Sequence, residues 1–447
     1  MERMDSGAET LLRRLNARGY EAYVVGGCVR DLLRGVTPHD WDICTSALPG
    51  ETKAVCSEFP VVETGLQHGT VTVLLDSTPY EVTTYRVDGR YSDGRRPDHV
   101  TFTPSLTEDL ARRDFTMNAI AMDVEGNLVD PFGGRSDIEN GVVRCVGEPD
   151  RRFREDGLRV MRGLRFAATL GYAIHPETAA ALHRCRAMLE QVAAERIWSE
   201  LKRLLTGSGV LPVLLDYPDV LSVFWPELGE MVGFDQRNPW HCWDVWEHTA
   251  RAVAAVPAEV PVRLAMLLHD VGKPRCCSVD KDGVGHFYGH AALSAQLAEE
   301  MLHRLRSERE TARAVLELVK RHDLPLSTDP KLLRRRLNQL GEERLLQLVE
   351  VQRGDALAQT PELVTQRLEE LEEIKEAIRQ LIAEGACTSV KMLAVTGRDL
   401  MEGGWQPGPA LGARLQFLLD QVLDGKLPNQ KEALLSFEKE SRQRKLP

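Results

Sequence analysis

The sequence predicts an α+β chain, in which a small mixed β-sheet is followed by a long, mostly helical remainder. Short β-branched or apolar runs bounded by Gly, Pro or Asp occur up to about residue 85, as expected of strands. Beyond about residue 148 these runs disappear, and apolar residues recur at the three-and-four spacing of amphipathic helices. The 447 residues are too many for one ordinary core, so we expect two to four domains.

Composition narrows the class of protein. Hydrophobic residues make up 43% and charged residues 28%, as in globular proteins, and no long apolar run predicts a membrane span. The net charge of −11 argues against a non-specific nucleic-acid coat, and we expect no DNA partner, although local arginine clusters still allow a phosphate-binding track. Nine scattered cysteines without a CxxC pair, and no secretory signal at the start, predict a cytoplasmic location.

The element pattern divides the chain into four expected domains. A head at 1–147 should contain strands at 24–25, 61–62, 71–75 and 81–85, with helices over 11–18 and 30–34. Breaks rich in Pro and Gly separate a helical neck at 148–208, a helical body at 209–360 and a helical tail at 361–447. Helices are expected over 158–170, 179–194, 194–205, 291–305 and 361–384, the last as one long exposed helix.

A double-glycine turn, Gly26-Gly27, follows the first predicted strand and precedes a helix start. Glycine lets the backbone approach a phosphate closely, and a helix N-terminus offers free N–H groups. Arg30 adds a forked hydrogen-bond donor. Taken alone, such a turn is often only a tight connection.

Asp40 and Asp42 lie two residues apart in the run HDWDI. In a strand, residues two apart point to the same face, so the two carboxylates are expected to project together. Magnesium prefers such oxygen ligands in combination with substrate phosphates, and it supports in-line phosphoryl transfer. Residues 88–98, DGRYSDGRRPD, predict a mobile loop, whose arginines favour a functional loop beside this site over a plain surface loop.

Five motifs follow one another between residues 20 and about 205: GGCVRD, HDWDI, RRDFTMNAIA, DPFGG and REDGLRVMRGLRF. Their order and spacing resemble those of bacterial class II CCA-adding tRNA nucleotidyltransferases and the related bacterial poly(A) polymerases. The resemblance implies a polymerase-β-like nucleotidyltransferase head that holds magnesium. It assigns Gly26, Gly27 and Arg30 to the triphosphate, Asp40 and Asp42 to the metal, and Arg113 and Asp114 to selection of the ribose.

Polymerases of this superfamily carry a third carboxylate on a neighbouring strand, and Glu81 is the candidate here. The alternative is that Glu81 is an ordinary charged residue at a strand edge. With Glu81 included, the predicted catalytic set is Asp40, Asp42 and Glu81. The DPFGG motif at 130–134 is expected to be a structural link between head and neck.

Asp156 and Arg159 match the family's EDxxR signature and are predicted to face the same way on one helix. A carboxylate accepts from the exocyclic amino groups of C and A, and arginine donates to ring nitrogens and carbonyls. The pair would therefore admit CTP and ATP and refuse UTP and GTP. The alternative is an ordinary ion pair. Arg162 and Arg165 continue the stripe and are expected to follow the triphosphate or the RNA end.

The body carries a second constellation of histidines and aspartates, and its order resembles the HD phosphohydrolase superfamily. The resemblance implies a second divalent metal on His248, His269, Asp270 and Asp355, with His290 and His322 as further ligands or phosphate contacts. Whether Asp323 or Asp355 closes the site is left open. A bound metal would activate water for phosphoester hydrolysis; the alternative is a degenerate fold kept for tRNA docking.

These predictions converge on template-independent addition of C, C and A, from CTP and ATP, to the 3′ end of tRNA. Alternatives within the family are an A-adding tRNA nucleotidyltransferase and a poly(A) polymerase. An alternative from another class is an HD-domain phosphohydrolase with a nucleotide-binding head.

Overall fold

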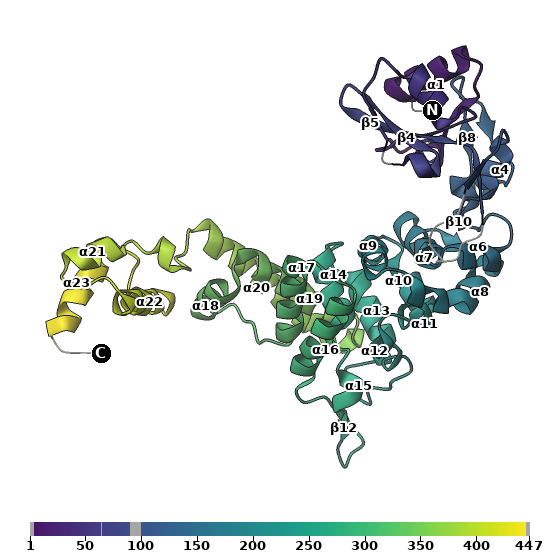
Figure 1. The fold of residues 1–447 in the computed structure, drawn as a ribbon. Coiled ribbons are helices and arrows are strands. Elements are labelled where there is room, and N and C mark those ends of the chain that lie inside the picture. Colours follow the sequence, from purple (N-terminus) through teal and green to yellow (C-terminus); the bar gives the residue numbers. More distant parts are fainter. Residues whose placement is uncertain (1–3, 64, 90–99, 444–447) are drawn as a thin grey trace. The chain divides into compact units, whose positions relative to one another are not determined.

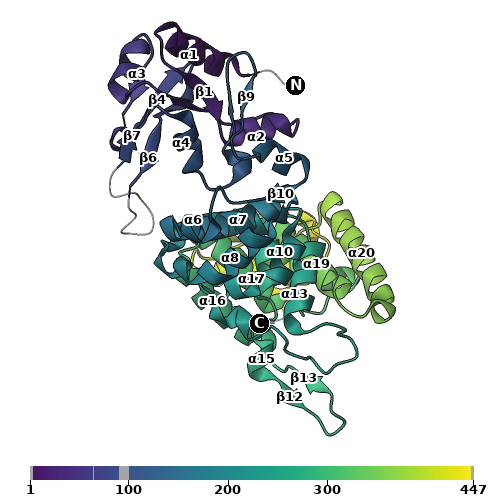
Figure 2. The same cartoon turned by 90° about the vertical axis from the view of Figure 1, so that its right-hand side faces the viewer.

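A computed structural model of the chain describes residues 4–63, 65–89 and 100–443. Two compact units make it up, one of Met1–Glu230 with Met301–Ser307 and one of Met231–Glu300 with Glu308–Pro447. Figures 1 and 2 label the elements of both units, and each unit is described by itself. The division into head, neck, body and tail remains a prediction, because the compact units follow a coarser boundary near residue 230.

The first unit begins with the predicted mixed sheet, in the order β3-β4-β5-β2-β1-β8-β9. Its neighbouring strands pair antiparallel except β2 and β5, which run parallel. The strands are β1 (Ala22–Val25), β2 (Asp42–Thr45), β3 (Val61–Val62), β4 (Thr70–Leu75), β5 (Thr78–Thr84), β8 (Ala121–Met122) and β9 (Leu128–Val129), with β6 (Arg86–Asp88) and β7 (Val100–Phe102) as a separate pair. All four predicted strands are present.

Short helices surround this sheet. They are α1 (Ser6–Ala17), α2 (Gly27–Leu33), α3 (Pro49–Val55), η1 (Leu66–His68), α4 (Leu106–Ala111), η2 (Thr116–Asn118) and α5 (Gly134–Glu139). The Asp5 side chain caps α1 by accepting from two backbone N–H groups, and the helix buries Leu11, Leu12 and Leu15. Figure 2 shows α1 and α3 beside the strands.

The rest of the first unit is helical, as predicted. It contains α6 (Pro149–Glu155), α7 (Leu158–Leu170), α8 (Pro176–Cys185), η3 (Arg186–Gln191), α9 (Ala194–Leu205), α10 (Val210–Asp216), α11 (Pro218–Leu221) and α12 (Pro226–Gly229), with β10 (Val142–Val143) parallel to β11 (Ala173–Ile174). The helices over 158–170 and 194–205 match the prediction, whereas the one expected over 179–194 breaks into α8 and η3. Phe115 and Phe166 meet edge-on at 5.6 Å and pack α7 against the head.

The second unit is formed around α13 (Val245–Ala255), α14 (Val260–Leu268), α17 (Arg309–Arg321) and α19 (Glu342–Leu357), which pack on one another. The chain from residue 231 onward also contains α15 (Lys273–Cys276), β12 (Ser278–Val279), β13 (Gly285–His286), α16 (His290–Arg304), α18 (Pro330–Leu340), α20 (Pro361–Ala383), η4 (Val390–Met392), α21 (Gly397–Glu402), α22 (Pro409–Leu423) and α23 (Lys431–Gln443). The two-residue strands after residue 148 were not predicted, because pairs this short leave no periodic signal.

The long helix α20 differs in one respect from the prediction. Its bounds agree, but it is not fully exposed, because Leu371, Ile374 and Ile378 are buried and the helix packs on α19. Among the described residues, no helix is both long and apolar enough to span a membrane.

Candidate active site

The double-glycine turn joins β1 to α2. Gly26 has a φ of 84°, which favours glycine, and a Cβ atom there would lie 3.0 Å from Nη1 of Arg113. The turn therefore brings the Arg113 guanidinium against the start of α2. Arg30 is held by protein groups, because it donates to both oxygens of Asp31 and, at 2.8 Å, to Oδ1 of Asn118.

The acidic side of the site begins at the edge of β2. Asp40 and Asp42 are exposed and flank the buried Trp41, so they share one face, although Asp40 lies just before the strand. On the parallel neighbour β5, Glu81 is the register partner of Asp42 and is also exposed. Glu81 therefore occupies the position expected of a third carboxylate.

Electrostatics connects these groups. Desolvation by the surrounding protein raises the pKa of Asp42, the charges of Glu81 and Asp40 raise it further, and Arg113 opposes them. The three carboxylates do not form a closed cluster: among the described residues, three or more candidate ligand atoms come within 4.8 Å of one another only in the body. The head thus offers an open acidic edge with one arginine beside it.

Asp114 lies behind this edge and is buried. Its Oδ1 accepts from the Phe115 N–H at 2.8 Å and from Asn118 Nδ2 at 3.1 Å, and its Oδ2 accepts from Arg162 Nε at 2.8 Å. Although burial opposes ionisation, Arg162, Asn118 and Arg159 together hold the pKa of Asp114 well below its usual range. In this arrangement Asp114 anchors α7, and both of its oxygens are already used.

The prediction that Asp156 and Arg159 lie on one helix is wrong. Asp156 lies between α6 and α7 in an extended conformation, with φ −139° and ψ 107°. Its Oδ1 atom accepts from the Leu158 N–H at 3.0 Å at the start of α7. The adjoining Gly157 packs tightly, because a Cβ atom there would lie 2.6 Å from the Met188 carbonyl oxygen. Asp156 pairs instead with Arg196 of α9 at 3.1 Å.

Arg159 points into the interior. Its guanidinium donates to Glu155 at 2.7 Å, to the Arg152 carbonyl at 3.1 Å and to the Arg112 carbonyl at 3.0 Å. The remaining members of the predicted arginine stripe are paired as well. Arg165 donates to Glu200 at 2.8 Å, and Arg162 joins Asp114. The stripe is therefore a row of salt bridges, one of which joins the neck to Asp114 of the head.

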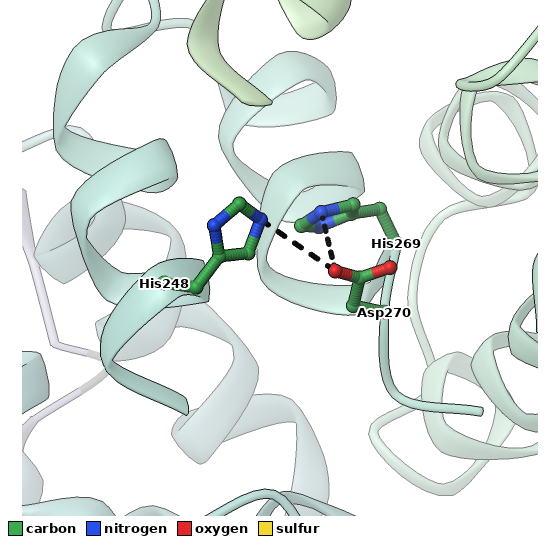
Figure 3. A group of neighbouring side chains, drawn as sticks. All are labelled: His248, His269 and Asp270. Carbon is green, nitrogen blue, oxygen red and sulfur yellow. Dashed lines mark ion pairs between the residues drawn. The ribbon is translucent and has the colours of Figure 1, made fainter. Parts of the chain in front are cut away.

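The body brings the predicted histidines and aspartates together. The Nε2 atom of His248 lies 3.0 Å from Asp355 and 3.6 Å from Asp270, and that of His269 lies 3.1 Å from the same Asp270 oxygen. Figure 3 shows both rings linked to this carboxylate. Asp355 therefore closes the cluster, whereas Asp323 lies on the wall of the adjoining cavity.

His290 and His322 complete the group on the other side of Asp270. Their Nε2 atoms lie 3.0 Å apart, and each faces Asp270 Oδ1, at 3.6 Å and 4.0 Å respectively. The cavity beside them has a volume of about 420 Å³ and is also lined by Lys273, Tyr288 and Asn238.

Three domain models of known proteins match parts of this chain. A model described as the poly A polymerase head domain matches residues 22–144, and one described as a probable RNA- and SrmB-binding site of polymerase A matches 171–217. A putative tRNA nucleotidyltransferase domain 2 matches 287–437. The CCA-adding enzyme of Levilactobacillus brevis is 37% identical over 432 residues, which is 96% of each chain. The chain belongs to the family of CCA-adding enzymes.

Other members agree with this assignment. The CCA-adding enzyme of Leuconostoc mesenteroides is 51% identical over 201 residues, 45% of this chain and 50% of that one. The crystal structure of the Bacillus stearothermophilus CCA-adding enzyme in complex with CTP is 31% identical, with a TM-score of 0.74 and 99% of both chains covered. Thermotoga maritima CCA-adding enzyme complexed with tRNA_CCA, at 20% identity and a TM-score of 0.60 over 97% of this chain and 96% of that one, shares the fold. Members of the family are nucleotidyltransferases that typically use a divalent metal ion.

The sequence did not predict the following contacts of this member of the CCA-adding family. Asn118 bridges Arg30 and Asp114, and Arg196 holds Asp156. Asn118 lies within the RRDFTMNAIA motif, and that position could have marked it as a site residue. Arg196, the partner of Asp156, lies forty residues away along the chain, and nothing in the sequence connects the two. The predicted loop at 88–98 lies, from residue 90, outside the described residues.

Proposed function

We propose that this chain adds C, C and A, from CTP and ATP, to the 3′ end of tRNA. The observation that carries the proposal is the meeting of a left-handed Gly26, Arg113 and the Asp42–Glu81 register pair at one end of the head sheet. A glycine turn with an arginine beside exposed carboxylates suits a nucleoside triphosphate with its metal. The chain's relatives are CCA-adding enzymes, one of them crystallised with CTP.

The acidic and basic residues of the head have different proposed roles. Asp40 and Asp42, with Glu81 beside them, would hold magnesium on the acidic edge, and their exposed, mutually repelling carboxylates fit a hard cation with oxygen ligands. When bound, magnesium lowers the pKa of the attacking hydroxyl and neutralises charge on the leaving pyrophosphate. Arg113, beside Gly26, contacts the triphosphate, and the tRNA 3′ oxygen attacks the α-phosphorus in line with the departing pyrophosphate.

Base selection is assigned to the neck. Asp156 presents a carboxylate that can accept from the amino group of C or A, and Arg196 fixes its orientation. Arg159, which donates to Glu155, to the Arg152 carbonyl and to the Arg112 carbonyl, holds the segment that carries Asp156. Arg30, Asp114, Arg162 and Arg165 position this machinery through their salt bridges.

One assay tests the proposal and its rivals. Purified protein is offered each labelled nucleotide with tRNA ending at the discriminator base, at C or at CC. We expect incorporation of C, C and A, and then no further growth. Growth on CC ends alone would indicate an A-adding enzyme, and long A tails a poly(A) polymerase.

Variants of the acidic edge test the site itself. Asp40→Ala and Asp42→Ala should each reduce incorporation by at least about a thousandfold, since both charge neutralisation and hydroxyl activation depend on them. Asp123→Ala, a half-buried aspartate in the head whose side-chain hydrogen bonds stay within its own turn, is the matched control and should retain activity. Incorporation that survives in both variants would place the metal elsewhere.

We also propose a cytoplasmic location, supported by nine cysteines that are all free.

A further inference from the structure

Asp109 is a fully buried carboxylate of α4, and it lies outside the five motifs of the sequence. Its neighbours Leu106 and Leu110 on the same helix pack with Val25 and Cys44 of the sheet in one hydrophobic cluster. A charge in such surroundings is stable only when cations or hydrogen-bond donors balance it. The groups that meet the Asp109 carboxylate therefore indicate its role.

Arg112 makes the closer of two ion pairs with Asp109. Its Nε donates to Oδ1 at 2.9 Å, its Nη2 lies 2.8 Å from the same oxygen, and the Arg86 backbone N–H donates to that oxygen at 3.2 Å. The Arg112 carbonyl in turn accepts from Arg159 of the neck. Oδ1 of Asp109 is therefore occupied by contacts that hold the head together.

Arg113 makes the looser pair, with the other oxygen of Asp109. Its Nη2 lies 3.6 Å from Oδ2, which is longer than a hydrogen bond. Among the described residues, Oδ2 and the Nε atom of Arg113 have no hydrogen-bond partner, although both atoms are buried. Buried polar atoms of this kind are normally hydrogen-bonded. Asp109 thus attracts the Arg113 guanidinium by charge, without a hydrogen bond.

The other terminal nitrogen of Arg113, Nη1, faces the double-glycine turn. It lies 3.0 Å from the position that a Cβ atom would take at Gly26. The acidic edge is also near, since desolvation raises the pKa of Asp42 and the charge of Arg113 lowers it. Arg113 therefore lies within reach of two kinds of anion: the buried carboxylate of Asp109 and the exposed carboxylates that would hold magnesium.

We propose that Asp109 is a positioning residue for nucleotidyl transfer. Its charge holds Arg113 at the Gly26 turn and prevents that arginine from pairing with Asp42. The magnesium ligands then stay free, and the guanidinium keeps donors for the triphosphate. This role rests on the proposed function, because it assumes that the head sheet binds a nucleoside triphosphate together with its metal.

Removal of the Asp109 charge should release Arg113 toward the acidic edge. In Asp109→Asn the neutral amide no longer attracts the guanidinium, so the Asp42 carboxylate becomes its favoured partner. An arginine paired with Asp42 would compete with magnesium for that carboxylate and would lose its contact with the triphosphate. Nucleotide and metal should therefore both bind more weakly, while the rate at saturation is retained.

Affinity measurements on the full chain test this role. Isothermal titration calorimetry follows the binding of inorganic tripolyphosphate and of CTP in the presence of Mg²⁺ and without tRNA. Asp109→Asn should weaken both affinities about tenfold. In the incorporation assay it should raise KM for CTP to a similar extent, with kcat within about threefold of wild type. The Mg²⁺ concentration that gives half-maximal incorporation should also rise severalfold.

The matched control is Asp137→Asn. Asp137 is likewise a buried carboxylate of the head, and it pairs with Arg144 at 3.1 Å. This variant should lower the melting temperature but leave the affinity for tripolyphosphate within about twofold of wild type. In an Arg113→Gln background, Asp109→Asn should weaken binding no further, because it acts through Arg113. Should Asp109→Asn not fold, Asp109→Glu and Asp109→Gln compare carboxylate with amide at equal size, and the same tenfold difference is expected between them.

Two results would overturn the positioning role. One is an equal affinity of wild type and Asp109→Asn for tripolyphosphate. The other is a tenfold loss that persists in the Arg113→Gln background, because Asp109 would then act through Arg112 or through the fold. The proposed function fails separately: a wild-type chain that binds tripolyphosphate but adds no C to tRNA would refute nucleotide addition and leave the binding comparison intact.

Discussion

Replacing Asp114 by asparagine removes one negative charge and keeps the size of the side chain. The Oδ2 atom of Asp114 accepts from Nε of Arg162 at 2.8 Å and lies 2.7 Å from its Nη2. An amide NH2 group at that position would face two donors, so both charge-assisted contacts are lost. Breaking a buried ion pair from one side costs about 3–5 kcal/mol, and a hydrogen bond to a charged group contributes about 1.5–3 kcal/mol.

The structure places the expected cost toward the lower end. The Arg162 side chain keeps 32% of its surface exposed, so water can take over part of the lost contact. We expect a loss of about 2–3 kcal/mol, and at about 2–4 °C per kcal/mol for a unit of this size, a fall in melting temperature on the order of 5–10 °C. The measurement is differential scanning calorimetry of the full chain without nucleotide.

The matched control is Glu139→Gln in the same unit. Glu139 pairs with Arg135 at 2.9 Å on the surface, with both side chains about three-fifths exposed (62% and 60%). Such a pair contributes about 0.5 kcal/mol or less, so its transition should move by less than about 2 °C. If Asp114→Asn melts with the control, the reasoning that makes Asp114 the buried anchor of α7 is wrong.

Three further predictions follow from the same unit. Gly157→Ala should destabilise the unit by about 1–3 kcal/mol, because the new Cβ atom would clash with the Met188 carbonyl oxygen. The control Gly50→Ala, in open space on α3, should be neutral or slightly stabilising, and equal melting temperatures of the two variants would contradict the clash at Gly157. Because folding lowers the pKa of Asp114, the ionised carboxylate stabilises the fold fully above about pH 4, and this stabilisation is lost as the pH falls toward the pKa of the folded state. The difference in unfolding free energy between wild type and Asp114→Asn, measured by urea titration, should therefore narrow below about pH 4 and not above it. Arg196→Gln should lower kcat/KM for CTP about tenfold and weaken discrimination against UTP, since Asp156 loses the partner that orients it; unchanged incorporation of all four nucleotides would exclude that role.

Local patterns predicted the parts of this protein that local interactions decide. Valine-rich runs between turn residues became β1, β3 and β4, and apolar spacing located α7 and α9 to the residue. These features depend on neighbours in sequence, so periodicity carries the information.

Contacts between distant segments were not predictable in the same way. Spacing of three suggested that Asp156 and Arg159 share a helix, but Asp156 is extended and lies between α6 and α7. The partner of Asp156, Arg196, is set by how α9 packs on α7. The sequence could name the histidines of the body, but not that their Nε2 atoms divide between two sides of Asp270.

The salt bridges around α7 have a consequence for how a nucleotide is attracted. Arg159, Arg162 and Arg165 were expected to form a positive track, yet they pair with Glu155, Asp114 and Glu200 respectively, so the row carries no net charge. A triphosphate approaching this wall meets little long-range attraction from it. Because Arg113 also pairs with a carboxylate, that of Asp109 at 3.6 Å, capture falls mainly to the cations that the triphosphate brings. Nucleotide affinity should therefore follow the concentration of divalent ions far more closely than the ionic strength of the buffer.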